Sequence, residues 1–188
     1  MNKNITAYTC LLIKGELIVN CLQEWVDENV AEVKAIQKKI EISNEEGDTF
    51  VGYLDFVIVN KEGKTILVDL KTSSNPSAYY PEDSANNSRQ LGIYSQEEEI
   101  SDVAYLVIDK TMRVKYPKVR LHFIEGVITE EHLDEVFYQI EKVTENIKEK
   151  LELGEGAFNW NKDSCSKFGG CEYSQYCWKG KKDKLEEV

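Results

Sequence analysis

Long apolar runs are missing from this sequence, and their absence excludes several classes of protein. No stretch of the 188 residues approaches the ~20 consecutive apolar residues that span a bilayer. The first ten residues, MNKNITAYTC, lack the apolar stretch and small-residue cleavage site of a secretory signal. With 41% hydrophobic residues, the composition is neither collagen-like nor disordered. We therefore expect a cytoplasmic, globular protein with one main domain.

Positive charge is scarce as well. Lys and Arg total 23 against 34 Asp and Glu, which gives a formal net charge of −11. This balance argues against broad, non-specific coating of nucleic acid. It leaves room for a local basic groove or for a carboxylate site that holds cations.

The spacing of apolar residues predicts a mixed α/β fold. We expect helices over residues 16–39, 84–99 and 129–151, and strands over residues 50–59, 65–70, 103–108 and 119–127. The segment NKEGK between the first two strands is typical of a hairpin loop. This order predicts an α/β sandwich with a mixed central sheet flanked by helices. We place the core at residues 1–157 and a Cys-rich appendage, packed back on the N-terminus, at residues 158–188.

Two carboxylates on the predicted hairpin are the most informative feature of the chain. If Val59 pairs with Thr65, Asp55 lies directly opposite Asp69, with Cβ atoms ~4.5–5.5 Å apart. Two carboxylates that close repel each other unless a cation lies between them, and hard divalent ions accept such oxygen ligands. Lys71 follows on the same face. A solvated strand face would explain isolated charges, but both aspartates interrupt apolar runs, so the sequence favours a metal site for phosphodiester hydrolysis.

The same residues resemble the core of the PD-(D/E)XK nuclease superfamily. Asp55, thirteen further residues and then Asp69-Leu70-Lys71 match its central motif. The fold class implied is a mixed sheet with flanking helices. The resemblance also implies Asp55, Asp69 and the Leu70 carbonyl as ligands of Mg²⁺ or Mn²⁺, and Lys71 as the catalytic lysine.

Gln90 and Tyr94 extend the resemblance to the RecB-like branch. Four residues apart, they share a helix face, and they are similar to the QxxxY element of that branch. By themselves they would be a surface glutamine and a core tyrosine. After the Asp-x-Lys strand, the resemblance implies that they help to position DNA or the active site. The resemblance covers roughly residues 40–178. Within this branch, the sequence is similar to phage exonucleases and CRISPR-adaptation exonucleases.

One departure concerns the first helix. Similar nucleases often carry a metal-binding histidine there, and this sequence has none at the equivalent place. Asn20 is a weak substitute. Glu24, or alternatively Glu16, is our candidate for the carboxylate that other branches of the superfamily supply from this helix.

Three of the five cysteines lie near the C-terminus with the spacing C-x5-C-x5-C: Cys165, Cys171 and Cys177. An odd total and the expected cytoplasmic setting argue against disulfides. Three thiolates need a fourth partner, and zinc sites usually show tighter pairs, so the spacing favours a 4Fe–4S cluster over zinc. RecB-like relatives imply an upstream fourth ligand, Cys10, with Cys21 as the alternative. Three free thiols in a loop remain the competing interpretation.

A basic segment is the predicted DNA contact, with Tyr116 available for stacking on a base. Its charged residues are Lys110, Arg113, Lys115, Lys118 and Arg120. Solvated loops often carry such charges too. Neither histidine, His122 or His132, is expected to be a metal ligand.

These features predict a divalent-metal-dependent DNA nuclease. We expect an exonuclease on single-stranded DNA or DNA ends, in phage or bacterial recombination, repair or defence. The alternative is a catalytically inactive protein of nuclease fold that binds DNA ends or a partner protein. A restriction-type endonuclease fits less well, and a protein partner or a homo-oligomer stays open.

Overall fold

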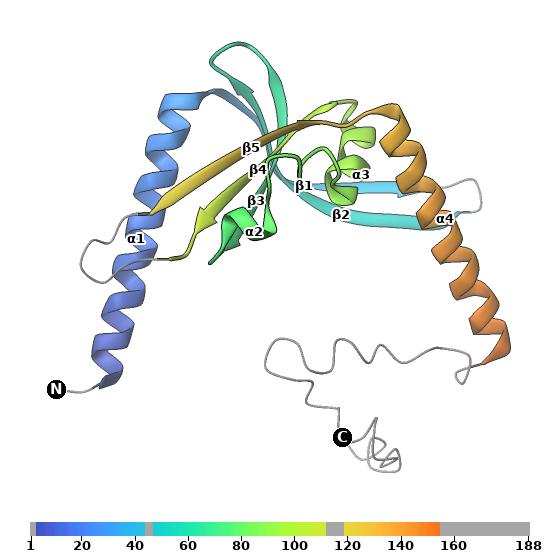
Figure 1. Cartoon of the computed structure of the whole chain (residues 1–188), viewed down its shortest axis with the longest axis horizontal. Helices are drawn as coiled ribbons and strands as arrows, with labels where there is room; N and C mark the ends of the chain where they lie inside the picture. The colour runs from blue at the N-terminus through green and yellow to red at the C-terminus, as the bar shows by residue number, and fades with distance from the viewer. Residues whose placement is uncertain (1–2, 44–46, 112–118, 155–188) are drawn as a thin grey trace. The chain divides into compact units, whose positions relative to one another are not determined.

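The computed structural model describes residues 3–43, 47–111 and 119–154, with side chains from residue 13 onward (Figure 1). Its elements are α1 (Lys3–Asn29), β1 (Val30–Ser43), β2 (Thr49–Asn60), β3 (Thr65–Ser73), α2 (Pro76–Tyr79), α3 (Arg89–Glu98), β4 (Asp102–Asp109), β5 (Arg120–Val127) and α4 (Glu130–Leu153). The chain divides into two compact units, residues 1–139 and 140–188. Among the described helices, none is long and apolar enough to cross a membrane.

The first unit is built on one mixed sheet. Its strands follow the order β1-β2-β3-β4-β5, and each pairs antiparallel with its neighbour except β3 with β4, which are parallel. Parallel neighbours need a crossover connection, and here residues 74–101, which contain α2 and α3, provide it. The predicted mixed α/β sandwich is confirmed.

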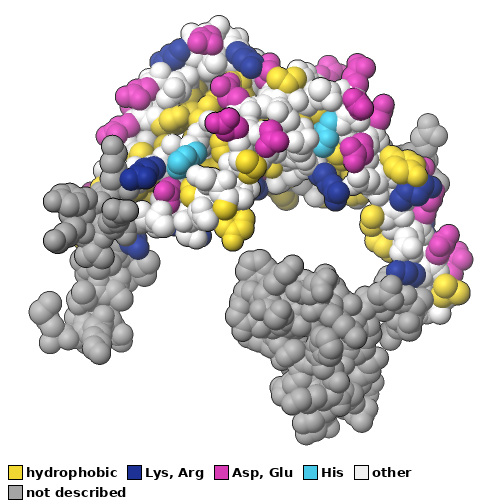
Figure 2. Space-filling model, viewed as in Figure 1, with side chains coloured by type: hydrophobic (Ala, Val, Ile, Leu, Met, Phe, Trp, Pro, Cys, Tyr) yellow, Lys and Arg dark blue, Asp and Glu magenta, His cyan; other side chains and the backbone are white. Residues whose placement is uncertain are grey.

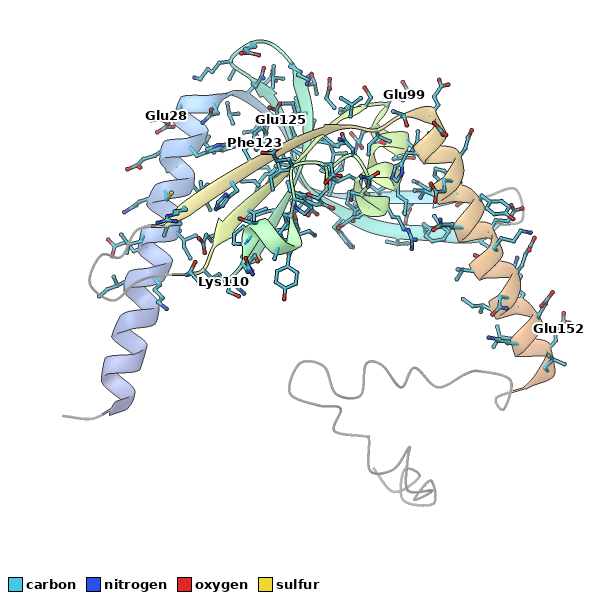
Figure 3. All side chains as sticks on the ribbon, in the orientation of Figure 1. Glu28, Glu99, Lys110, Phe123, Glu125 and Glu152 are labelled. Carbon is cyan, nitrogen blue, oxygen red and sulfur yellow. The ribbon has the colours of Figure 1, made fainter. Side chains whose placement is uncertain are left out.

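The crossover and α1 cover opposite faces of the sheet. On one face, Trp25 and its neighbours on α1 pack against Ile58, Val68 and Leu106. The ring of Trp25 also lies 5.0 Å from that of Phe123 on β5 (centroid to centroid; Figure 3 labels Phe123). The other face carries the second core cluster, with contributions from Ile40, Leu54, Val57, Leu67, Leu91, Tyr94, Val103, Tyr105 and Val107. Leu67 and Val68, neighbours on β3, therefore point to opposite faces of the sheet.

The predicted helix over residues 16–39 is wrong in its second half. Helix α1 already begins at Lys3 and ends at Asn29, and β1 follows without a loop. The apolar residues Val30, Val33, Ile36 and Ile40 recur at helical spacing, yet the segment is also rich in β-branched residues. Pairing with β2, which exists only in the folded chain, decides in favour of the strand.

The other predicted elements are confirmed with small shifts. Both strands of the hairpin and its loop lie where the pattern places them, as do β4 and β5. Helix α3 starts at Arg89, five residues later than expected, because Ser88 caps it by accepting a hydrogen bond from the Leu91 N–H. Helix α4 is capped by Thr129, whose hydroxyl accepts the His132 N–H at 3.2 Å. The predicted boundary at residues 157/158 falls outside the described residues.

Gly126 on β5 fixes the loop that leads into α3, and it provides a test of the packing. A Cβ there would lie 2.7 Å from the Asn86 backbone nitrogen, and neither backbone can yield without moving the loop. We expect Gly126→Ala to lower the free energy of unfolding in urea by about 2 kcal/mol, because overpacking forces a backbone shift.

Gly15 in α1 is the matched control for this prediction. A Cβ there meets nothing within 4 Å, so Gly15→Ala should stabilise the chain by up to about 1 kcal/mol. Equal stability of Gly126→Ala and the unchanged protein would contradict the close approach of β5 to this loop.

Candidate active site

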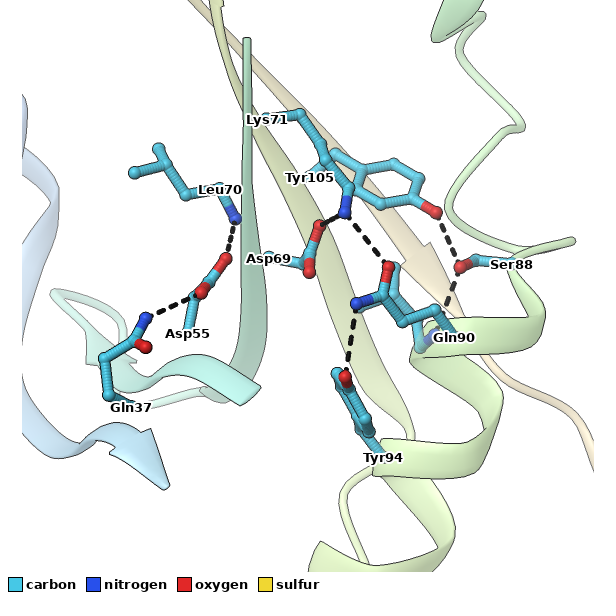
Figure 4. A network of polar contacts seen from close by, with 10 residues as sticks. Gln37, Asp55, Asp69, Leu70, Lys71, Ser88, Gln90, Tyr94 and Tyr105 are labelled. Atoms are coloured by element: carbon cyan, nitrogen blue, oxygen red, sulfur yellow. Dashed lines mark hydrogen bonds and ion pairs between the residues drawn. The ribbon is translucent and has the colours of Figure 1, made fainter. Parts of the chain in front are cut away.

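Strands β2 and β3 stop pairing at the two predicted carboxylates. Their register runs from Val59 opposite Thr65 to Phe56 opposite Val68, as the hairpin predicts. The next positions are Asp55 and Asp69. There the Leu70 N–H donates to Asp55 Oδ2 at 2.8 Å, so a side chain and not the β2 backbone satisfies it (Figure 4). The two aspartates therefore lie on neighbouring strands at the point where the strands part.

Asp69 is a buried carboxylate at this point. It is 2% exposed and follows three buried apolar residues of β3. The Lys71 ammonium lies 2.6 Å from Asp69 Oδ2 and forms an ion pair with it. Burial raises the pKa of Asp69, the ion pair with Lys71 opposes that effect, and the charge of Asp55 adds to it; the net direction is upward. Without a metal ion, the negative charge of Asp69 is consequently destabilised by burial, and added positive charge would stabilise it.

Lys71 is held from two sides. Burial works against its charge, but the hydrogen bond and attraction from Asp69 outweigh burial and raise the pKa of Lys71 above 10.5. Its Nζ also donates to Gln90 Oε1 at 3.0 Å, and Gln90 Nε2 donates to the Tyr94 hydroxyl at 3.2 Å (Figure 4). Lys71 is thus a protonated, oriented ammonium, and the predicted shared face of Gln90 and Tyr94 is turned toward it.

Tyr94 is itself fixed by close packing against β2. A Cβ on Gly52 would lie 2.7 Å from Tyr94 Cε1, so only glycine admits the ring here. This contact joins the strand that carries Asp55 to the helix that carries Gln90.

Besides the hydrogen bond between Lys71 and Gln90, a further polar contact links the start of α3 to β4. The Tyr105 hydroxyl donates to Ser88 Oγ at 2.6 Å, and burial is the main cause that raises the pKa of Tyr105. Tyr105 lies beside Asp69 in the parallel register. Sequence reasoning missed both residues. Ser88 carried a usable signal as a helix-capping serine, whereas the approach of Tyr105 depends on a pairing distant in sequence.

The oxygen ligands of the described residues meet part of the coordination needs of a hard divalent cation. Asp55, Asp69 and the Leu70 carbonyl offer oxygen atoms, the ligand type that Mg²⁺ and Mn²⁺ prefer, and the burial of Asp69 makes added positive charge favourable. Within the described ranges, no cluster of three or more His, Cys, Asp or Glu residues could hold an ion. Mg²⁺ commonly needs only one or two protein carboxylates because it keeps several waters.

The predicted helix carboxylates are not brought to this site by any described contact. Glu24 and Glu16 are exposed on α1, whose apolar side packs on the sheet face opposite Lys71 and α3. Their role as a further ligand stays a prediction.

The cysteines of the predicted cluster lie outside the described side chains. This applies to Cys10, Cys165, Cys171 and Cys177. Cys21 is described: it is half-buried on α1, and its thiol donates to the Val119 carbonyl at 3.8 Å.

Two of the predicted basic residues are described, at the neighbouring ends of β4 and β5. Lys110 follows β4 (Figure 3), and Arg120 begins β5 opposite Asp109. The Lys110 N–H donates to the Ser73 carbonyl at 2.7 Å, which ties the ends of β3 and β4 together. On the face drawn in Figure 2, the described Lys and Arg side chains lie apart among Asp and Glu. The remaining members, Arg113, Lys115 and Lys118, lie outside the described residues.

The histidines take structural positions in the described chain. His122 lies within β5, and the His132 ring nitrogen Nε2 is 3.3 Å from the Ser88 carbonyl.

Comparison with known proteins gives one family. Residues 12–178 match the model of the PD-(D/E)XK nuclease superfamily. Among solved structures, the crystal structure of SSO0001 is similar with a TM-score of 0.39 and 17% sequence identity, over 73% of this chain and 63% of that one. This chain therefore spans less than two thirds of the length of SSO0001. No curated protein matches the chain.

The burial of Asp69 predicts a characteristic pH dependence of the metal-free protein. A carboxyl whose pKa is raised by folding favours the folded state at low pH, and this contribution is lost as pH rises through the folded pKa. We therefore expect Asp69→Asn to gain stability relative to the unchanged protein as pH rises above about 3.8, the ordinary value for Asp. Urea unfolding in EDTA at pH 4 to 7 measures the difference.

Asp109 is the control of opposite sign. Thr111 donates to it and lowers the pKa of Asp109, so its contribution is present above the ordinary value and lost as pH falls. Asp109→Asn should lose stability at neutral pH, with a deficit that shrinks in acid. Parallel pH trends for the two variants would contradict the assigned state of Asp69.

Proposed function

The chain belongs to the PD-(D/E)XK nuclease superfamily, and on that premise we propose that it hydrolyses phosphodiester bonds of DNA with a bound divalent metal ion. The observation that carries the proposal is the buried Asp69 carboxylate at the point where β2 leaves β3. Asp55, which accepts the Leu70 N–H, lies beside it, and Lys71 pairs with it. Asp55 and Asp69 would hold Mg²⁺ or Mn²⁺.

Held by these residues, a divalent ion would supply polarisation of the phosphodiester and activation of a water molecule. Lys71 would act on the charge that develops on the phosphoryl oxygens, because its ammonium is held at the site by Asp69 and Gln90. It is therefore assigned the role of electrostatic stabiliser. Gln90 keeps the ammonium in place when a cation competes for Asp69, and Tyr94 fixes the amide of Gln90.

The proposed substrate is single-stranded DNA or a DNA end, attacked as by an exonuclease. Lys110 and Arg120 support contact with the phosphate backbone because both are exposed, at the neighbouring ends of β4 and β5. The acidic remainder of the chain disfavours a broad grip on duplex DNA. A role in phage or bacterial recombination, repair or defence fits such a substrate.

A 4Fe–4S cluster held by Cys165, Cys171, Cys177 and Cys10 is the second part of the proposal, with zinc as the other metal that four thiolates accept. Its support is the even cysteine spacing. The position of Cys21 favours Cys10 as the fourth ligand, because the thiol of Cys21 is half-buried in contact with Val119.

An inactive protein of nuclease fold is the second candidate. It is favoured by one observation: within the described residues, no third carboxylate joins Asp55 and Asp69. Such a protein would bind DNA ends or a partner protein without cutting.

Cleavage assays separate these functions. With Mn²⁺ and a labelled single-stranded oligonucleotide, we expect Asp69→Asn and Lys71→Gln each to lower the cleavage rate by about 100-fold or more, the usual loss for a group that stabilises transition-state charge. Asp134→Asn and Lys61→Gln remove the same charges from positions away from the site and should cleave normally.

Calorimetric titration with Mn²⁺ completes the test. The enzyme should bind the ion, and Asp55→Ala should not. Full cleavage by both Asp69→Asn and Lys71→Gln would remove the site from consideration, whereas a folded chain that binds DNA but cleaves nothing would establish the second candidate.

The cysteine proposal is tested on protein purified without oxygen. We expect an absorption band near ~400 nm and about four irons per chain, as for a thiolate-bound cubane cluster. Cys171→Ser and Cys10→Ser should lose the iron, while Cys21→Ser should keep it. Zinc in place of iron would recast the appendage as a zinc site, and retention of iron by Cys10→Ser would exclude Cys10 as a ligand.

A further inference from the structure

Gln37 on the edge strand β1 contacts the predicted metal ligand Asp55 from the side opposite to β3. Its Nε2 donates to Asp55 Oδ1 at 2.8 Å, while the Leu70 N–H donates to Asp55 Oδ2 (Figure 4). Each carboxylate oxygen thus accepts one hydrogen bond and keeps a second lone pair. Donors from both neighbouring strands fix the plane of this carboxylate.

The backbone of Gln37 is strained to reach this position. Its φ is +49°, in the left-handed region that residues other than Gly, Asn and Asp seldom occupy. Among the described residues other than glycine, Glu99 alone shares a positive φ, and Glu99 is the ordinary left-handed cap that ends α3. Gln37 lies inside a strand, where no cap or turn requires such a conformation.

At this residue the side chains of the β1–β2 ribbon exchange faces of the sheet, although the pairing register stays the same. Ile36 pairs with Phe56 and Lys38 pairs with Leu54, so neither strand carries an inserted residue between them. Even so, Phe56 packs with the cluster under α1, whereas Leu54 packs with the cluster under α3. An uninterrupted strand would place both on one face.

This exchange of faces contributes to the packing of the sheet independently of the glutamine side chain. It lets the outer ribbon meet α3, where Gly52 contacts Tyr94 and Lys38 pairs with Glu98. Glycine would adopt the same backbone without strain. The chain instead carries a long amide there, exposed to solvent, which donates its hydrogen bond to Asp55.

We propose that Gln37 is a positioning residue that holds the Asp55 carboxylate in the orientation in which it accepts a divalent cation. The proposal rests on the metal site of the proposed function. Partners that orient a metal ligand usually change metal affinity by 10–100-fold when removed. Gln37 would not touch the metal ion or the substrate.

Two substitutions at this position separate orientation from strain. Gln37→Ala and Gln37→Gly both remove the hydrogen bond to Asp55, so both should weaken Mn²⁺ binding by about 10-fold or more in calorimetry. In EDTA, however, the glycine variant should melt about 2–4 °C above the alanine variant, because only glycine adopts the left-handed backbone without strain.

Glu41, at a regular position of β1 opposite Val51, is the matched control. There the order should reverse, with Glu41→Gly melting below Glu41→Ala, and Mn²⁺ affinity should be unchanged in both. Absence of Mn²⁺ binding by the unchanged protein would overturn the proposed metal site itself. Unchanged affinity in both Gln37 variants, beside normal binding by the unchanged protein, would overturn the role of Gln37 alone.

Discussion

The first unit is organised around one buried negative charge, the Asp69 carboxylate, at the end of the β2–β3 pairing. A buried carboxylate is unfavourable unless cations and hydrogen-bond donors surround it. The sheet leaves room for them because the pairing of β2 with β3 ends at Phe56 and Val68, one position before the two aspartates. Lys71 supplies the positive charge. The Leu70 N–H, which the parting of the strands would leave without a partner, donates to Asp55.

The parallel pairing of β3 with β4 explains why α3 lies close to this charge. A parallel pair requires a crossover, and the crossover places α3 on the face to which Lys71 points. Three contacts then hold the helix: Ser88 caps it and receives the Tyr105 hydroxyl, and Tyr94 packs on Gly52. Gln90 can therefore orient Lys71 because its helix is fixed to both β2 and β4.

The features that the sequence predicted are those encoded by neighbouring residues. The β2–β3 hairpin has a short polar loop and two apolar runs, and these alone set the register that brings Asp55 and Asp69 to the positions where the pairing ends. Residues 30–39 satisfy the spacing of a helix and the composition of a strand, and only the pairing of β1 with β2 resolves the ambiguity. Tyr105 and Gln37 escaped prediction for the same reason, since each reaches the site through a strand pairing that no local pattern reveals.

Two departures from favourable local structure lie on either side of Asp55, one on β1 and one on β3, and their coincidence is the strongest structural argument for a functional site. A buried anion on β3 and a left-handed glutamine on β1 each destabilise the folded chain, and both act on the same pair of carboxylates. Strand pairing requires neither the glutamine side chain nor the negative charge, because glycine at position 37 would adopt the same backbone and a neutral residue at position 69 would preserve the pairing. Such costs persist where a further interaction offsets them. A divalent cation between Asp55 and Asp69 would be an interaction of the required sign: it would neutralise the buried anion and make use of the orientation proposed for the Asp55 carboxylate.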